Sequence, residues 1–461
     1  MKGSPDKNTI LFIITLSSFL TPFMGSVSGI CLPSIGKEFN MNAITLSWVA
    51  TSYLLASAIF LLPIGKIADI VGRKTVFLSG MTIFTLASLL TGFASTEFLL
   101  IFYRVLQGIG SAMIFGTSIA IISCVFPEKE RGKALGISVA AVYLGLSLGP
   151  IIGGFFTEHF GWRSPFFLVV PIGLLCVILG LIKMKDQWAD AKGEKIDYLG
   201  SIIYSATILL LMLGVSFLPE NRGIYLIAGG TVCFGLFIWW QIKTPTPIID
   251  FKLFKGNRIF VFSNLAAFIN YSATFSITFL LSLYLQYIKQ LNPLQAGMIM
   301  ISQPIVQVLV SPYAGKLSDK IEPGIVASIG MALTVIGLII LTFISKETNV
   351  FLIEASLITL GAGFGLFSSP NTNAIMSSVD KKLYGVASGT LGTMRVVGQM
   401  FSMGIVMIIF AFYMGKVKIT PDKYDMFLLS IKIIFAILSA LCIIGIFASV
   451  ARGKVIKAKT E

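Results

Sequence analysis

Residues 136–154 decide how this chain folds, and they read Gly-Ile-Ser-Val-Ala-Ala-Val-Tyr-Leu-Gly-Leu-Ser-Leu-Gly-Pro-Ile-Ile-Gly-Gly. The stretch is apolar and long enough to cross much of a bilayer, yet it contains five glycines and one proline. Small residues recur every four positions and form one bare stripe on a helix: Ala141, Gly145, Gly149 and Gly153. Such a stripe lets a second membrane helix approach closely. Pro150 lacks a backbone donor and is expected to bend the helix near its far end.

The composition places the chain in a membrane. Its 461 residues are 56% hydrophobic and 12% charged, with a mean hydropathy of +0.89, whereas soluble proteins average about 25% charged residues. The net charge of +14 comes from basic residues in short loops between apolar runs, where they report topology rather than nucleic-acid binding. The five cysteines lie in or beside apolar runs without metal-ligand spacing, so we expect buried thiols and no metal site.

Apolar runs near 20 residues predict an all-α integral membrane protein with 14 transmembrane helices. Their approximate ranges are 9–32, 45–65, 75–95, 98–126, 132–157, 164–183, 196–217, 223–242, 259–287, 294–314, 324–345, 349–376, 384–413 and 427–450. An even number puts both termini on one side of the membrane. If that side is the cytoplasm, the inner loops and tails hold about 24 basic residues against about 8 outside. We therefore expect a multi-pass protein of the plasma (inner) membrane with both termini cytoplasmic.

An internal repeat divides the chain. Gly-Lys-Ile-Ala-Asp at 65–69 returns as Gly-Lys-Leu-Ser-Asp at 315–319, and Gly-Ile-Gly at 108–110 is echoed by Gly-Ala-Gly at 361–363. Such duplication is typical of transporters that move two bundles about a central site. The predicted division is two pseudo-repeated six-helix bundles at 1–183 and 259–451, cytoplasmic linkers with two inserted helices (about 196–242) at 184–258, and a basic cytoplasmic tail at 452–461.

The first copy of the repeat lies in a predicted cytoplasmic turn that reads Gly-Lys-Ile-Ala-Asp-Ile-Val-Gly-Arg-Lys over 65–74. Its glycines permit a tight turn, and its aspartate can accept from a helix N-terminus or pair with the arginine. Contacts of this kind suit an inner gate, and ordinary positive-inside charge is the alternative. The gate candidates are Gly65, Asp69, Gly72, Arg73 and Lys74, with Asp319 from the less complete second copy.

Three of the charged residues inside predicted spans are candidates for a function. Arg104 is about seven residues, or roughly 10 Å, into the fourth helix, and Arg395 about twelve residues, or roughly 18 Å, into the thirteenth. Each could couple transport to an ion, or it could be a structural arginine bonded to helix carbonyls. Glu354 lies about six residues into the twelfth helix from its outer side. It could bind and release a proton, partner Arg395, or snorkel to the interface.

Polar or aromatic residues in apolar helices are candidates for lining a substrate cavity. Each could instead join two helices, because a buried amide needs a partner. The candidates are Met24, Tyr53, Gln107, Tyr143, Asn270, Tyr271, Gln303, Gln307 and Asn371. The sequence has no phosphate-binding loop for ATP and no nucleophile–base constellation. We therefore expect no enzyme and no cofactor, and transport driven by an ion or substrate gradient.

Four segments resemble the major facilitator superfamily, 14-helix drug:proton antiporter subfamily. They are the inner loop at 65–74, the fourth-helix motif at 103–110, the fifth-helix antiporter motif at 136–154, and the glycine-rich arginine segment at 389–399. The resemblance implies two bundles that alternate around a central cavity, and a part for Arg104 in proton coupling. The antiporter motif implies export, and its residues here are Gly136, Gly145, Gly149, Pro150, Gly153 and Gly154.

The first helix departs from the subfamily. It ends Phe-Met-Gly-Ser-Val-Ser-Gly-Ile-Cys-Leu-Pro over 23–33, and Met24 occupies the place of an aspartate that is a favoured site for protons or cationic drugs. Its loss leaves the first half without an obvious acid inside the membrane, which favours an anionic or zwitterionic substrate.

Together these features predict a monomeric secondary transporter that exports amphipathic small molecules, a multidrug-type efflux protein working by proton antiport and alternating access. The glycine stripe with Pro150 is expected to seal the two bundles against each other. Two alternatives stay open. One is a facilitator or symporter for an anionic metabolite or lipid precursor. The other is a membrane sensor or scaffold that has lost transport.

Overall fold

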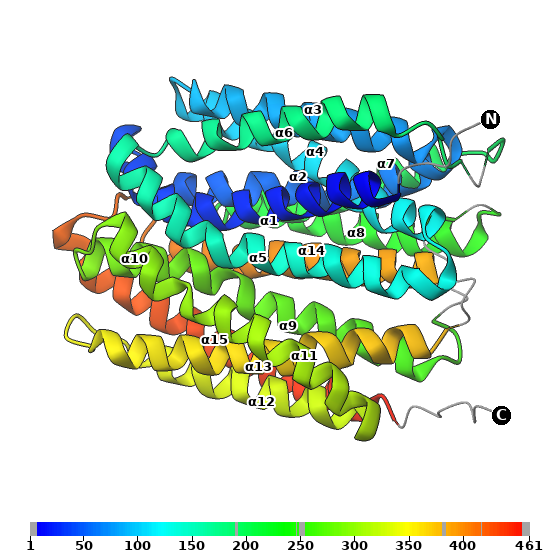
Figure 1. The fold of residues 1–461 in the computed structure, drawn as a ribbon. Helices are drawn as coiled ribbons and strands as arrows, with labels where there is room; N and C mark the ends of the chain where they lie inside the picture. Colours follow the sequence, from blue (N-terminus) through cyan, green and yellow to red (C-terminus); the bar gives the residue numbers. More distant parts are fainter. Residues whose placement is uncertain are drawn as a thin grey trace.

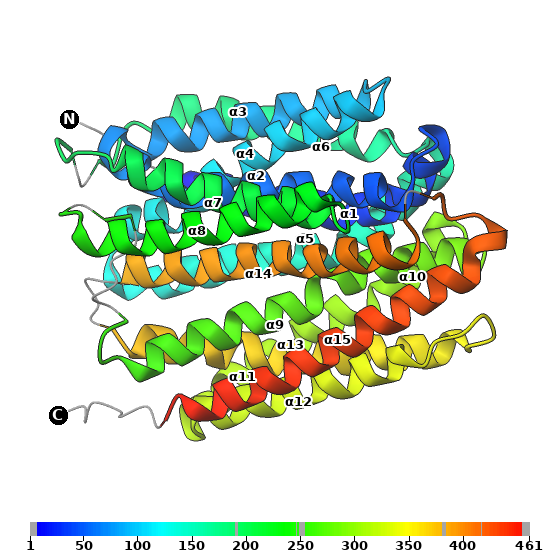
Figure 2. The same ribbon diagram turned by 180° about the vertical axis from the view of Figure 1, so that it is seen from behind.

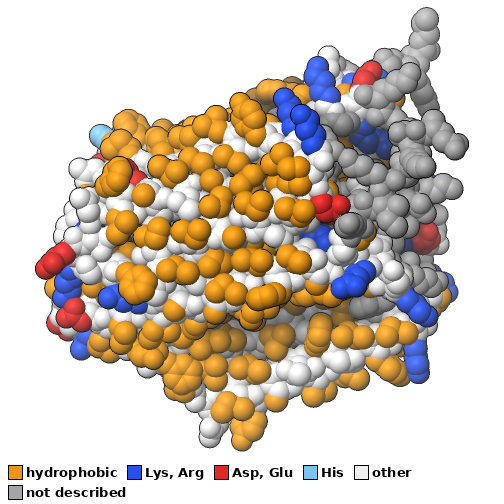
Figure 3. Space-filling view, turned by 90° about the horizontal axis from the view of Figure 1, so that it is seen from below, with side chains coloured by type: hydrophobic (Ala, Val, Ile, Leu, Met, Phe, Trp, Pro, Cys, Tyr) orange, Lys and Arg blue, Asp and Glu red, His pale blue; other side chains and the backbone are white. Residues whose placement is uncertain are grey.

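The computed structural model describes residues 7–189, 192–245, 247–248, 254–379, 384–415 and 417–453. Within these ranges the chain is helical and has no strand. Fourteen helical stretches of the described chain are long and apolar enough to cross a membrane, which confirms the predicted number. In Figure 3 hydrophobic side chains cover the middle of one face, while charged side chains gather toward its two ends. That distribution is the one expected of a surface facing lipid.

The first half of the chain and the inserted pair each give one helix per predicted span. The bounds are α1 (Lys7–Glu38), α2 (Ala43–Val71), α3 (Arg73–Gly92), α4 (Glu97–Val125), α5 (Glu128–Phe160), α6 (Ser164–Lys183), α7 (Tyr198–Ser216) and α8 (Asn221–Lys243). Local signals set several of these ends. Asn42 caps α2 by accepting from the Thr45 amide, and Thr96 caps α4 by accepting from the Leu99 amide.

In the second half, two of the spans are not continuous α-helices. Its helices are α9 (Arg258–Leu283), α10 (Pro293–Met300), α11 (Ser302–Lys320), α12 (Pro323–Thr342), α13 (Val350–Ser377), α14 (Tyr384–Tyr413) and α15 (Tyr424–Ala451). A π turn (Tyr284–Ile288) extends α9, and a short 3-10 turn (Pro421–Lys423) precedes α15. Helices α10 and α11 form one span broken at Ile301.

The two halves pack internally in the same pattern (Figures 1 and 2). In the first half the main partners are α1 with α5, α3 with α4, α2 with α4 and α3 with α6. The second half pairs α9 with α14, α12 with α13, α11 with α13 and α12 with α15. The start of α1 and the end of α15 lie at the same end of the molecule, called here the near end; the opposite end is the far end.

The inserted helices α7 and α8 lie along one boundary between the halves (Figure 2). Helix α7 contacts both α2 and α14. The Tyr204 hydroxyl donates to the Ala58 carbonyl at 2.9 Å, and the Trp48 indole donates to the Ser216 hydroxyl at 3.0 Å. The inserted pair therefore covers the seam between α2 and α14.

The glycine stripe of α5 packs mainly inside its own half. A Cβ atom on Gly145 would lie 2.4 Å from the Phe19 carbonyl oxygen of α1, and one on Gly149 would lie 2.6 Å from the Ser26 Cβ. The contact with the other half comes from the neighbouring face. There a Cβ on Gly154 would lie 2.6 Å from the Pro293 carbonyl, and one on Gly297 would lie 2.1 Å from the Pro150 carbonyl. The stripe thus binds α1, and Pro150 with Gly154 forms the seal to α10. This corrects the expectation that the stripe itself faces the second bundle.

Replacing Gly145 by alanine should destabilise the protein by about 1–3 kcal/mol, because the new methyl group meets a backbone carbonyl that cannot move aside. Gly136→Ala on the same helix is the matched control, since its Cβ has open space around it. Thermal unfolding of the purified variants measures both effects. Equal melting temperatures for the two variants would contradict the close packing of α5 on α1.

Candidate functional site

The two halves are joined at the far end by hydrogen bonds from several elements. The Ala43 amide donates to the Val417 carbonyl at 3.1 Å, and Lys418 Nζ donates to Asn40 Oδ1 at 3.1 Å. Deeper in, the Ser282 hydroxyl donates to the Gly29 carbonyl at 2.5 Å. The π turn after α9 adds bonds from the Gln286 amide to the Ile30 carbonyl and from the Tyr287 hydroxyl to the Pro33 carbonyl. These contacts close the far end.

A group of polar side chains lies between the halves at about the middle of the helices. We call it the central polar cluster, and its members are Tyr143 of α5, Tyr271 of α9, Gln307 of α11, Ser368 of α13 and Arg395 of α14. The Tyr143 hydroxyl is 2.8 Å from the Ser368 hydroxyl, which links the two halves directly. Tyr143 also lies near enough to Arg395, Tyr271 and Gln307 to interact with all three.

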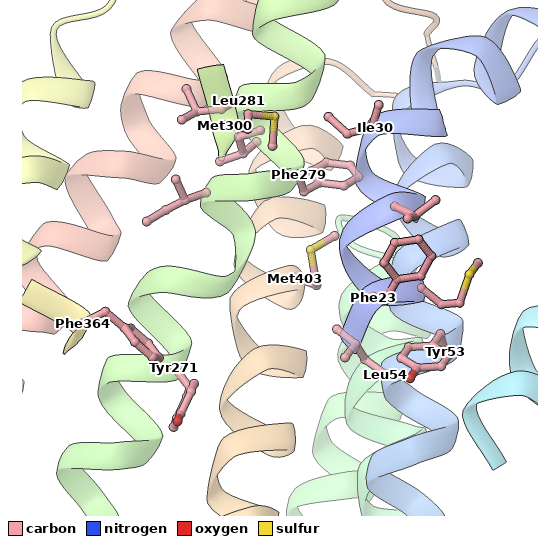
Figure 4. Close-up of a cluster of buried hydrophobic side chains, with 14 of the residues drawn as sticks. Phe23, Ile30, Tyr53, Leu54, Tyr271, Phe279, Leu281, Met300, Phe364 and Met403 are labelled. Carbon is pink, nitrogen blue, oxygen red and sulfur yellow. The ribbon is translucent and has the colours of Figure 1, made fainter. Parts of the chain in front are cut away.

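Aromatic rings form one wall of the cluster. The Arg395 guanidinium carbon is 4.9 Å from the centroid of the Tyr271 ring. The Phe364 ring meets Tyr271 edge-on, with centroids 5.4 Å apart (Figure 4). Gly398 makes this placement possible, because a Cβ there would lie 2.7 Å from the Phe268 carbonyl of α9. Helices α9 and α14 therefore touch closely one turn from Arg395.

Two donors of the cluster make no hydrogen bond of good geometry, although the Gln307 amide lies close to the Tyr143 hydroxyl and the Arg395 guanidinium close to Tyr271. The two donors are Nε2 of Gln307 and Nε of Arg395, both atoms shielded from solvent. The Gln307 side chain is only 5% exposed, whereas Arg395 and Tyr143 are partly exposed. A buried donor without a partner costs free energy. The cluster therefore has unused capacity to bind an acceptor.

Arg104 belongs to a different, internally satisfied network. Its Nε donates to the Val49 carbonyl of α2 at 3.0 Å, and its guanidinium also donates to Gln107. Gln107 in turn donates to the Ser88 hydroxyl of α3 at 2.7 Å. The guanidinium stacks 4.6 Å from the Tyr53 ring, whose hydroxyl donates to Ser111. These contacts join α2, α3 and α4, and they match the structural alternative for Arg104, Gln107 and Tyr53.

Asn371 belongs to a second buried arginine network, which lies in the second half close to the end of the molecule where α1 begins and α15 ends. Arg452 is 1% exposed and donates to Asn371 Oδ1 at 3.0 Å and to the Ser449 carbonyl at 2.7 Å. The Asn371 amide donates to the Ser263 carbonyl at 3.1 Å. The sequence places Arg452 in the basic tail, but it folds back between helix ends, where four oxygen atoms accept its hydrogen bonds: Oδ1 of Asn371, the Ser449 carbonyl and the hydroxyls of Ser263 and Ser449. The remaining tail residues, 454–461, lie outside the described part.

Glu354 stands apart from the central polar cluster. It is partly exposed in the second turn of α13, and Ser368 follows it by 14 residues, or roughly 21 Å along the helix. Among the described residues it has no hydrogen-bond or ion-pair partner. Glu354 is therefore not the partner of Arg395, contrary to one of the options that the sequence left open.

The remaining cavity candidates are scattered. Met24 and Asn270 are fully buried, and both polar atoms of the Asn270 amide lack a partner. Gln303 is partly exposed on α11. Ser368 and Phe364 were missed by the sequence reasoning, since a serine and a phenylalanine in an apolar helix carry no distinguishing signal.

The predicted inner turn has the expected geometry. Gly72 joins α2 to α3 with φ of 123°, a value that favours glycine. Arg73 pairs with Asp69 at 2.7 Å, and Arg73 Nη1 lies 2.8 Å from the Cys124 sulfur. Lys66 pairs with Glu194 of the α6–α7 linker at 2.5 Å. Gly65 has open space around it, and the side chain of Asp319 lies outside the described part.

Comparisons with known proteins agree with this arrangement. The Major Facilitator Superfamily model matches residues 14–403. The riboflavin transporter RibZ of Clostridioides difficile (strain 630) is 32% identical over 386 residues, which cover 84% of each chain. The multidrug resistance protein Stp of Mycobacterium tuberculosis (strain CDC 1551 / Oshkosh) is 28% identical, covering 84% of this chain and 72% of its own. The fold is similar to that of a bacterial homologue of the human lysosomal transporter Spinster, with a TM-score of 0.69, 14% identity and coverage of 99% and 98%.

Replacing Asn371 by leucine should lower stability by about 2 kcal/mol, because Arg452 loses an acceptor in a buried site. Substrate affinity of the folded variant should not change, since Asn371 serves the Arg452 network. Asn373→Leu, at an exposed position on the same helix whose amide donates to the Ser318 hydroxyl at 3.1 Å, is the comparison and should cost less stability. Thermal unfolding and ligand binding measure the two effects. A loss of affinity without a loss of stability would return Asn371 to the substrate site.

Proposed function

We propose that this chain, which belongs to the Major Facilitator Superfamily, exports amphipathic small molecules across the plasma membrane by alternating access. Members of the superfamily are transporters rather than enzymes, and this chain is a multi-pass membrane protein with 14 candidate spans. The observation that carries the proposal is the hydrogen bond between Tyr143 and Ser368. It places a polar cluster between two halves that are closed against each other at the far end.

Alternating access gives these contacts a function. In alternating access, a substrate bound midway between the halves is open to one side of the membrane while the contacts between the halves close the other side. The bonds at Ala43, Gly29 and Ile30 would have to break for release at the far end. The Asp69–Arg73 pair at the near end would be the corresponding inner gate. By the distribution of lysine and arginine, the near end with both termini faces the cytoplasm.

Two features support export. Residues 136–154 match the antiporter motif, and Pro150 and Gly154 of that motif contact the second half. The relative Stp is named a multidrug resistance protein. We propose proton antiport as the driving reaction, with Glu354 and Arg395 as coupling candidates, and a monomer as the working unit. Glu354 is the carboxylate among these candidates, and we therefore propose it as the group that carries the proton.

A second candidate is a facilitator or symporter for an anionic or uncharged metabolite. The relative RibZ is named a riboflavin transporter. Arg395 in the central polar cluster has no ion-pair partner among the described residues. Its free positive charge favours an anionic metabolite. The two candidates differ in their response to a pH gradient.

Inside-out vesicles that contain the protein should accumulate a fluorescent amphipathic probe, such as riboflavin or norfloxacin, when their interior is acidic. A protonophore should abolish the accumulation, because antiport needs the gradient. Vesicles from cells without the protein are the control. Accumulation that persists after the gradient collapses would overturn antiport and favour the facilitator.

Glu354→Gln should uncouple substrate movement from the pH gradient while probe binding is retained, because the amide cannot release a proton. Glu347→Gln, in the exposed turn before α13, is the matched control. Proton flux on addition of probe, followed with a pH-sensitive dye, makes the measurement. Normal coupling in Glu354→Gln would remove this residue from the mechanism.

A further inference from the structure

We propose that the central polar cluster binds planar molecules that present hydrogen-bond acceptors or a negative charge, and that it rejects lipophilic cations of the same shape. This inference rests on the proposed function, since it assigns a substrate class to the same site. It concerns binding, so it can be tested separately from the direction or coupling of transport.

The first argument is an excess of donors. Nε2 of Gln307 and Nε of Arg395 are shielded from solvent and make no hydrogen bond of good geometry, although the two side chains lie close to the Tyr143 and Tyr271 hydroxyls. Tyr143 and Ser368 share one hydrogen bond, which leaves one of their two hydroxyl protons free to reorient toward a ligand. An amide, a guanidinium and two hydroxyls gathered between the halves would be satisfied by carbonyl, ring-nitrogen or carboxylate acceptors of a ligand.

The positive charge of Arg395 is not compensated by a nearby carboxylate among the described residues. Within the described ranges no carboxylate pairs with Arg395, and its charged or polar neighbours are Tyr271 and Tyr143. Glu354 lies roughly 21 Å along α13 from Ser368, the cluster residue on the same helix. A positive charge held at mid-membrane without a counter-ion attracts an anion and repels a cation.

The third argument is the shape of the wall. The Tyr271 ring has the guanidinium over it and the edge of Phe364 beside it. Figure 4 shows these two rings together on α9 and α13. A flat aromatic ligand can stack on such a wall and still reach the guanidinium and the Gln307 amide with its polar edge. Flexible aliphatic chains would gain less from the same surface.

Three fluorescent probes test the proposal: fluorescein as the planar anion, riboflavin as the uncharged acceptor-rich ring, and tetramethylrhodamine ethyl ester as the planar cation. The full chain is held in nanodiscs of phosphatidylcholine, and binding is followed by fluorescence anisotropy. Fluorescein and riboflavin should bind at least about tenfold more tightly than the rhodamine ester. Equal or tighter binding of the cation, or no binding of any probe, would overturn the proposal.

Variants separate charge from hydrogen bonding. Arg395→Gln should weaken fluorescein binding by about tenfold and reduce the preference over the cation, whereas Arg395→Lys should keep the preference. Gln307→Leu should weaken riboflavin binding more than fluorescein binding. Arg222→Gln, at the exposed start of α8, is the matched control and should change nothing. Melting temperatures identify variants that fail to fold. If Arg395→Gln does not fold, the test rests on Arg395→Lys, which should still prefer fluorescein over the rhodamine ester.

The outcomes also distinguish this inference from the proposed function. If the probes bind as stated but vesicles show no gradient-driven accumulation, export by antiport fails and the substrate class stands. If vesicles accumulate the rhodamine ester in preference to fluorescein, the substrate class fails and transport stands.

Discussion

Close backbone contact on two faces of α5 is the interaction on which the arrangement of the halves depends. In lipid, apolar side chains gain little by meeting one another, so helices associate where small residues let their backbones touch. Gly145 and Gly149 bring α5 onto α1, and Gly154 brings it onto the start of α10. One helix thereby belongs firmly to the first half and still forms a seam with the second. The Tyr143 hydroxyl, on the same helix, reaches Ser368 across that seam.

Arg104, Arg395 and Arg452 have very different surroundings. Arg104 and Arg452 are almost completely buried, and carbonyls, amides and hydroxyls of neighbouring helices accept their hydrogen bonds. Both bind helices together within one half. Arg395 is partly exposed, stacks on Tyr271 and keeps an unpartnered Nε. The contrast separates two structural arginines from the one that is available to a ligand.

Much of the fold could be predicted from the sequence because length and hydropathy determine which segments span a bilayer. The 14 spans and the glycine at the turn after α2 follow directly from composition and spacing. The spacing of small residues does not indicate which helix will pack against them. The sequence therefore predicts that the glycine stripe faces the second half, whereas it packs on α1. Residue type alone does not distinguish Asn371 from Tyr143 as a cavity candidate. Tertiary contacts show that Asn371 accepts a hydrogen bond from Arg452, whereas Tyr143 bonds Ser368 of the other half. Arg452 was assigned to a tail because hydropathy ends where its helix ends.

The central claim is that the far end must open for transport. It is tested most directly by replacing Ala43 and Val417, whose backbones are hydrogen-bonded there, with cysteines and joining them by oxidation. Transport into vesicles should stop when the disulfide forms and return when it is reduced, while either single cysteine variant should be unaffected by the oxidant. Undiminished transport by the cross-linked protein would contradict the account.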